Sequence, residues 1–426
     1  MRRRRLANES ATDYLWGIND NKRHSQMKNN GSNVVLGAAT IGLGLCVASS
    51  QVLAEPPTAE EMWDKIQELE MKVETTGEMI EESAGSGGHG GGGVLWGGYA
   101  EVHYNAGDKQ QIDVHRWVLF TEYEFNDKLR VQGEFELEHA LAGDGKPGEV
   151  ELEQAFIEYN TSPSNAVFAG VVLVPVGMLN ETHEPPTFFG VERDRVHSQI
   201  IPTTWWEAGV GSRGELNEGL GYDIFLHSGL DVDETAFTMR GGRQKVAEAV
   251  ANRPAITGRL RYTGFPGLNL TVAAQYQDDL TQGTAETGTD TDFDTDATLL
   301  NVTADYRSGP IGLKAMYARW DLDEGTTGVG PASLGRDEQW GYFIEPSYRF
   351  AAPGAGGDGE IGVFARYYAF DTAASDSTGS VEDGFTVGFN WWIHPDVVLK
   401  ADYDEITIEN STSDDDRLNL GIGWQF

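Results

Sequence analysis

The sequence predicts an all-β protein, a transmembrane antiparallel β-barrel of about sixteen strands preceded by a short N-terminal coiled-coil helix. Three observations indicate this class. From Trp96 onward, segments of about ten residues alternate apolar and polar side chains. Tight and longer connections alternate between these segments, and aromatic residues gather at their ends. With 53 Gly among 426 residues, the chain is too hydrophilic for a helical membrane protein and too regular for a disordered one.

The chain is strongly acidic, with 67 Asp and Glu against 31 Lys and Arg and a formal net charge of −36. Residues 1–54 hold seven basic and three acidic residues, so the remainder carries 24 against 64, a net charge of −40. This surface argues against nucleic acid as a partner. It fits either a saline habitat or acidic external loops.

The first 54 residues have the pattern of a secretory signal peptide. A polar start at Met27 precedes an apolar run, Val34–Val47, and a cleavage site is expected after Ala54. The run is shorter than the ~20 residues that span a bilayer. Residues 1–26 are either an over-extended start or an additional targeting region. The single cysteine, Cys46, lies in this segment and follows Leu45, which disfavours lipid attachment, so the remaining chain offers no thiol chemistry.

Residues 55–82 are expected to form a periplasmic coiled-coil helix, because apolar or small side chains recur at spacings of four and three. These positions are Met62, Ile66, Leu69, Val73, Thr76 and Ile80. A helix this short is marginal alone, so partner helices are expected, and we predict a homotrimer. The alternative is a solitary helix at the barrel mouth. Residues 83–95, mostly glycine, are expected to be a flexible linker to the barrel at 96–426.

The last predicted strand shows the barrel pattern most clearly. Leu418, Leu420 and Ile422 alternate with Asn419 and Gly421, and the chain ends on an aromatic residue. In water a strand can show the same stripe, but its repetition with aromatic ends favours a membrane barrel. A soluble sandwich or propeller does not account for the signal peptide and the alternating connections together.

The connections give the number of strands. Seven tight ones are expected at 126–127, 161–165, 217–219, 266–267, 308–310, 352–359 and 395–396, and eight longer ones at 105–111, 141–148, 176–203, 229–252, 278–295, 322–337, 371–383 and 409–416. Together they join sixteen strands, the even parity that bacterial single-chain barrels require, with both ends on the periplasmic side. A barrel of this size encloses an aqueous channel.

If the apolar parity faces lipid, the other parity lines the bore. The predicted pore-lining residues are Arg130, Glu134, Glu136, Arg213, Arg259, Arg261, Lys314, Arg349, Arg366 and Lys400. Charges stay hydrated on this face, whereas the lipid face would cost them about 2–4 kcal/mol near the midplane. Rings of such charges set selectivity in channels. The simpler alternative is a solvated wall with weak ion pairs.

The segment from His183 to Trp206 is the third outer-side connection and one of the longest. Pro185 and Pro186 are expected to exclude a helix and strand pairing at its entry. Phe188 and Ile200 are too apolar for bulk water, so we expect the segment to fold into the bore. The residues expected to narrow the lumen are His183, Glu184, Glu192, Arg193, Asp194 and Arg195. The alternative is an external loop that covers a neighbouring subunit.

No catalytic, cofactor or metal-binding pattern stands out in the sequence. There is no Ser-His-Asp spacing, no histidine spacing typical of a metal site, and no strand–glycine–helix context for phosphate binding. Residues 278–296 are acidic but lack the pattern of a calcium loop, and are expected to be solvated. Residues 240–245 are locally basic, and either attract anions at the mouth or pair with acidic neighbours. We therefore expect no enzyme and no cofactor.

Several strings resemble the phosphate-selective porin O and P family. They are IDVHRWVL (112–119), ELEHA (136–140), EVELEQA (149–155), LVPVG (173–177), HEPPTF (183–188), VER (191–193), IIPTTW (200–205) and GRQ (242–244), within a resemblance that covers most of 96–426. The resemblance implies a trimeric sixteen-stranded channel in the outer membrane of a Gram-negative bacterium, embedded in its lipid.

The function expected from this resemblance and from the predicted interior is a diffusion channel. We expect it to pass small hydrophilic solutes or ions, and the resemblance adds anions such as phosphate to these. The mixed signs of charge on the predicted interior face argue against a phosphate-specific filter. The alternative is a non-conducting structural or adhesive barrel.

Overall fold

The computed structural model describes residues 93–426, except 108, 284–293, 324–329, 378 and 411–415. The predicted signal peptide and coiled-coil helix, and nearly all of the predicted linker, lie outside the described residues. Part of the acidic segment at 278–296 does so too.

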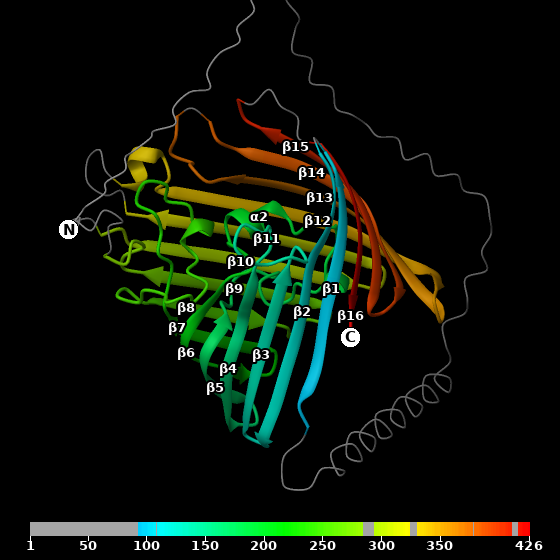
Figure 1. The fold of residues 1–426 in the computed structure, drawn as a ribbon, viewed down its shortest axis with the longest axis horizontal. Helices are drawn as coiled ribbons and strands as arrows, with labels where there is room; N and C mark the ends of the chain where they lie inside the picture. The colour runs from blue at the N-terminus through cyan, green and yellow to red at the C-terminus, as the bar shows by residue number, and fades with distance from the viewer. Residues whose placement is uncertain (1–92, 108, 284–293, 324–329, 378, 411–415) are drawn as a thin grey trace, which may run out of the picture. The chain divides into compact units, whose positions relative to one another are not determined.

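Sixteen antiparallel strands close into one barrel, in which β1 pairs with β16 and every other strand pairs with its neighbours in sequence (Figure 1). The strands are β1 (Leu95–Ala106), β2 (Gln110–Asn126), β3 (Leu129–Glu138), β4 (Val150–Ser162), β5 (Asn165–Leu173), β6 (Trp206–Asn217), β7 (Leu220–His227), β8 (Ala255–Tyr262), β9 (Leu268–Gln277), β10 (Ala297–Ser308), β11 (Ile311–Leu322), β12 (Glu338–Gly354), β13 (Gly357–Asp371), β14 (Glu382–His394), β15 (Val397–Ile408) and β16 (Arg417–Gln425). The predicted fold class and strand number are confirmed, and every predicted connection falls between the expected strands.

Closure leaves no unpaired sheet edge at the seam. The Gly98 amide donates to the Phe426 carbonyl oxygen at 2.9 Å, and the Phe426 amide donates to the Gly98 carbonyl oxygen at 2.9 Å. The last residue of the chain is therefore tied to the first strand, as a bilayer requires of a sheet edge.

The two faces of the wall differ as the alternation predicts. On β9, the side chains of Val272 and Tyr276 are exposed on the outside, whereas Thr271, Gln275 and Gln277 are buried on the inside. This order, apolar outside and polar inside, is that of a barrel in lipid with water in its bore. Among the described residues, no helix is long and apolar enough to cross a membrane.

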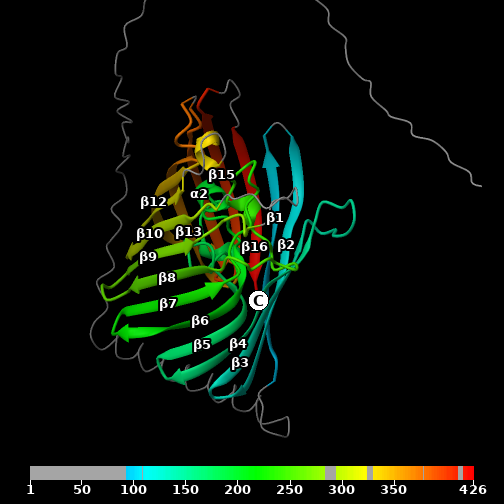
Figure 2. The ribbon, with the colours of Figure 1, turned by 90° about the vertical axis from the view of Figure 1, so that its left-hand side faces the viewer.

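Two connections occupy much of the interior. Residues 174–205, here called the β5–β6 segment, carry a 3₁₀ turn, η1 (Pro185–Thr187), and a short helix, α2 (Arg195–Gln199). Figures 1 and 2 show α2 within the ring of strands. Residues 228–254, the β7–β8 segment, carry η2 (Arg240–Gly242), and the β11–β12 connection carries η3 (Pro331–Leu334). One hydrophobic cluster joins apolar residues of the β5–β6 and β7–β8 segments to the inner wall.

One local expectation is wrong. Pro185 and Pro186 do not exclude a helix, because they occupy the first two positions of η1. Proline is tolerated there, since the amide groups of the first turn need no partner within the helix.

Candidate functional site

The apolar residues of the β5–β6 segment are buried against the barrel wall. The Phe189 ring lies 5.1 Å from that of Phe364 and 5.6 Å from that of Trp392, measured between centroids. The indole N–H of Trp320 donates to the Ile200 carbonyl oxygen at 2.9 Å. These side chains face inward, as expected, because their burial against the wall removes apolar area from water.

Four backbone carbonyls between Pro186 and Gly190 are held by wall side chains. The Pro186, Phe188, Phe189 and Gly190 oxygens accept hydrogen bonds of 2.8–2.9 Å, and the donors are Trp392, Asn390, Arg366 and Lys400, respectively. In the ring of sixteen strands, β13 lies eight strands from β5 in either direction. The segment leaves the wall at β5 and is bonded to β13, β14 and β15, so it crosses the interior of the barrel.

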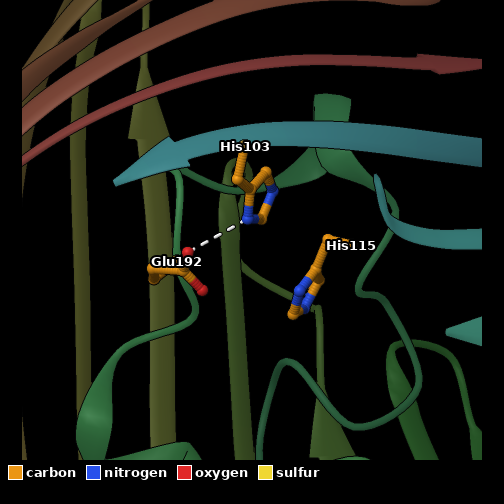
Figure 3. Close-up of side chains that lie close together, drawn as sticks. All are labelled: His103, His115 and Glu192. Carbon is orange, nitrogen blue, oxygen red and sulfur yellow. Dashed lines mark hydrogen bonds and ion pairs between the residues drawn. The ribbon is translucent and has the colours of Figure 1, made fainter. Parts of the chain in front are cut away.

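A second set of contacts ties the segment to β1 and β2. Arg116 donates to the His183 carbonyl oxygen at 2.9 Å and to Glu101 Oε1 at 2.5 Å. Further along the segment, Glu192 Oε1 lies 3.0 Å from His103 Nδ1 (Figure 3). The same oxygen accepts a hydrogen bond from the side-chain amide of Asn105 at 2.9 Å. The Glu192 carboxylate therefore fixes the segment to the inner face of β1.

α2 is organised by an aspartate and a histidine. Asp194 caps the helix, since its carboxylate accepts from the His197 amide at 3.0 Å and contacts His197 Nδ1 at 2.6 Å. His197 Nε2 in turn accepts from the Met178 and Leu179 amides at 3.1 and 3.3 Å. Burial raises the pKa of Asp194, but the nearby His197 outweighs this and the pKa is lowered. The pair is a structural element, buried away from the open space of the barrel.

The open space on the outer side of the segment is a cavity of about 720 Å³. Three of the six predicted constriction residues line it, namely Glu192, Arg193 and Arg195. His183 and Asp194 are buried and do not line it, and neither does Glu184.

The ten predicted pore-lining residues lie on the interior parity of their strands, but most are paired. Arg130 and Arg213 both donate to Glu158, at 2.6–2.9 Å, and Arg259 pairs with Asp223 and Glu181. Arg366 and Lys400 hold the β5–β6 segment. Of the other five, Glu134 accepts a hydrogen bond from the Gln154 side chain and Glu136 is buried. Arg261 lies beside Gly221. Lys314 and Arg349 line a second cavity of about 410 Å³.

Three arginines on the first cavity have no carboxylate partner among the described residues. Arg193 donates to Thr204 Oγ1 at 2.7 Å, Arg240 to the Thr203 carbonyl at 2.7 Å, and Arg243 to the Thr204 carbonyl at 2.5 Å. We call Arg193, Arg240 and Arg243 the arginine cluster. Burial and the neighbouring Arg240 lower the pKa of Arg243 to about 10, so it stays charged near neutral pH.

The basic stretch at 240–245 is expected either to attract anions or to pair with acidic neighbours, and its residues differ in this respect. Lys245 pairs with Glu149 and Glu151, whereas the partners of Arg240 and Arg243 within the described part of the chain are backbone carbonyls. The sequence identified the stretch but did not show that a second connection brings it beside Arg193. The proximity of Arg240 and Arg243 to Arg193 depends on how the β5–β6 and β7–β8 segments pack inside the barrel.

Groups suited to a metal ion also meet here, although no histidine spacing in the sequence indicates them. The groups are His103 with His115 and Glu192, Asp113 with His115 and His139, and Glu134 with Glu153 and His183. Figure 3 shows the first of these, with His103 directed at Glu192 and His115 beside it. Members of one group lie up to 89 positions apart in the sequence. Strand pairing and loop folding bring them together, which is why spacing does not predict these groups.

Comparison with known proteins gives a consistent result. A model of the family described as "Phosphate-selective porin O and P" matches residues 92–426. An uncharacterized protein of Aquifex aeolicus (strain VF5) is 31% identical over 373 residues, which cover 78% of this chain and 80% of that protein.

Solved structures of outer-membrane channels have the same fold. The channel DcaP of Acinetobacter baumannii is 13% identical with a TM-score of 0.54, covering 78% of this chain and 97% of that one. The anion-selective porin from Comamonas acidovorans is 15% identical with a TM-score of 0.53, covering 78% and 99%. At such identities the likeness concerns the fold alone.

Proposed function

Since this chain belongs to the phosphate-selective porin O and P family, we propose that its barrel is a water-filled diffusion channel for small hydrophilic solutes or ions. It is an outer-membrane porin of a Gram-negative bacterium, with sixteen strands closed into a barrel. The family and the fold point to a channel and not to an enzyme. The outward-facing apolar side chains are the surface that would meet outer-membrane lipid.

The β5–β6 segment is proposed to form the constriction of this channel. The observation that carries the proposal is the row of four carbonyls bonded to β13, β14 and β15. A segment anchored on both sides of the bore narrows the path for solutes. Glu192, Arg193 and Arg195, which line the outer cavity, are the side chains of this segment that a solute would meet first.

We propose that the channel favours small anions, phosphate among them, over cations of similar size. The support is the arginine cluster, because three cations with no carboxylate partner in the described part of the chain raise the local concentration of anions. The cavity wall has seven Lys and Arg against six Asp and Glu, in a chain where acidic residues outnumber basic ones 67 to 31. The Comamonas acidovorans porin is an anion-selective one, but the preference proposed for this chain rests on its own arginines.

A homotrimer is proposed as the working assembly. The support is the pattern of apolar and small side chains at 62–80, which would join helices from several chains outside the described barrel. Light scattering of the purified protein tests this, because a mass of three chains is expected and a mass of one chain would overturn it.

The function is tested by recording purified protein in planar bilayers. We expect stepwise conductance and, in a KCl gradient, a reversal potential of the sign that chloride preference gives. The second candidate is a non-conducting structural or adhesive barrel, favoured by the hydrophobic cluster that fills part of the interior. Correctly inserted protein without stepwise conductance would support that candidate and overturn the channel.

A further inference from the structure

A β-bulge in the wall directs an extra carboxylate into the barrel. Glu134 of β3 pairs with Gln154 of β4, whereas the next residue, Phe135, pairs with Leu152. Glu153 is therefore the extra residue of β4, and both it and Gln154 point inward. Bulges of this kind re-aim side chains and are common beside functional sites. Here the result is that the Glu153 carboxylate lies next to that of Glu134.

His183 of the β5–β6 segment completes the group. Its Nε2 atom lies 3.7 Å from Glu134 Oε1 and 3.7 Å from Glu153 Oε2. Its Nδ1 atom lies 3.1 Å from the carbonyl oxygen of Asn180. Because a carbonyl only accepts hydrogen bonds, Nδ1 carries the proton, and in the neutral ring Nε2 offers a lone pair. That lone pair faces two carboxylate oxygens.

These three atoms have no hydrogen-bond partner among the described residues. Glu134 Oε1, Glu153 Oε2 and His183 Nε2 are all buried and unpartnered, and the three residues are 1%, 1% and 3% exposed. Burial of carboxylates without a partner is costly unless a cation compensates them. Arg116, a nearby guanidinium, is bonded to Glu101, the Tyr99 hydroxyl and the His183 carbonyl instead.

We propose that Glu134, Glu153 and His183 bind one divalent first-row transition-metal ion, with Zn²⁺ as the best-suited probe. One ligand atom from each residue lies within 4.8 Å of the other two. Zinc binds imidazole nitrogen and carboxylate oxygen at about 2.0–2.2 Å, so only a small contraction of the group is needed. An imidazole in the ligand set favours zinc, copper or nickel over calcium and magnesium.

The surroundings have the features of an outer coordination shell. The Asn180 carbonyl oxygen orients the His183 ring, and the side-chain amide of Gln154 donates to Glu134 Oε2 at 2.6 Å. Such partners fix the direction of metal ligands. Glu153 also lines the outer cavity, which gives the ion an entry path and a fourth position for water or a solute oxygen. A bound ion would join β3, β4 and the β5–β6 segment.

The group around His103, His115 and Glu192 is the competing location. It is less suited, because Glu192 Oε1 already lies within hydrogen-bond distance of His103 and accepts from Asn105. It nevertheless gives the experiment a matched histidine control within the same barrel.

Zinc titration of the protein purified in detergent, after treatment with a chelator, tests the site. Calorimetry with ZnCl₂ is expected to show one saturable site per chain. His183→Asn and Glu153→Gln should each weaken it at least tenfold, whereas His115→Asn should leave it unchanged. No saturable binding would overturn the proposal and indicate a proton shared between the carboxylates. The proposal would also be overturned if His115→Asn lost zinc binding while His183→Asn bound zinc as tightly as the wild type.

X-ray absorption at the zinc edge gives a readout that needs no variant. The wild-type protein loaded with one equivalent of Zn²⁺ should show one imidazole and two or more oxygen ligands. Two imidazoles in the first shell would overturn the assignment and place the ion at one of the two groups that contain His115.

Discussion

The Lys400 ammonium lies 2.8 Å from the carbonyl oxygen of Gly190, a residue 210 positions earlier in the chain. It also lies 3.5 Å from the centroid of the Phe188 ring, a distance at which a cation is attracted to an aromatic face. Gly190 adopts a φ of 85°, a conformation that favours glycine. Lys400 thus holds the middle of the β5–β6 segment to β15, together with Asp402, which accepts from the Val191 backbone amide at 2.6 Å.

Replacement of that lysine should loosen the segment. Lys400→Met keeps the length of the side chain but removes the donor to Gly190, which leaves a buried carbonyl unpaired. We expect larger fluctuations of the open-channel current at constant voltage. Lys128→Met, in an exposed turn between β2 and β3, is the matched control. Equal current noise in both variants would contradict the role of Lys400.

Removal of two charges from the arginine cluster should reduce anion preference. Arg240→Gln/Arg243→Gln is expected to lower the anion-to-cation permeability ratio by on the order of two- to tenfold, because local counter-ion enrichment depends on these charges. The measurement is the reversal potential in a KCl gradient. The control is Arg319→Gln, which removes an arginine that does not line the outer cavity. An unchanged ratio in the double variant would exclude the cluster as the source of selectivity.

The contact between Glu192 and the wall predicts a pH dependence of stability. Burial raises the pKa of Glu192, but His103, His115 and Asn105 together lower it from 4.5 to about 2. A carboxyl whose folded pKa is lowered stabilises the fold above its unfolded pKa, and this is lost as pH falls through the folded value. Wild type should therefore unfold at a higher temperature than Glu192→Gln above about pH 4.5, with the difference gone near pH 2. A difference independent of pH would contradict this.

The cap of α2 predicts a cost in stability. Asp194→Ala removes the acceptor of the His197 amide, and the loss of such a cap lowers the free energy of unfolding by about 1–2 kcal/mol. Urea unfolding in lipid vesicles measures it. Asp144→Ala, an exposed aspartate in the β3–β4 connection, should change the value by less than about 0.5 kcal/mol. Similar values for the two variants would mean that the cap does not support the segment.

The sequence was sufficient to predict the barrel itself. Period-two alternation and the rhythm of connections depend only on local chain properties, and lipid outside with water inside imposes them on every strand. The terminal strand from Leu418 to Phe426 shows this directly, since its alternation matches the observed exposure.

The interior could be predicted only in part. Arg366 and Lys400 lie on the expected face, but alternation does not reveal that they bond to carbonyls of a loop. The bulge at Glu153 shifts the inward parity by one residue, and no residue type in the stretch marks it. The approach of the β7–β8 segment to Arg193 depends on packing between two loops, for which sequence periodicity carries no signal.

The unit conductance of a protein lacking part of the β5–β6 segment tests the central claim most directly. Deletion of residues 184–199 removes the carbonyl row and the lining residues Glu192, Arg193 and Arg195. Deletion of residues 143–146 in the exposed β3–β4 connection is the control. If the segment narrows the bore, the first deletion raises the unit conductance in planar bilayers and the control does not. An unchanged conductance in a correctly assembled protein would contradict the constriction.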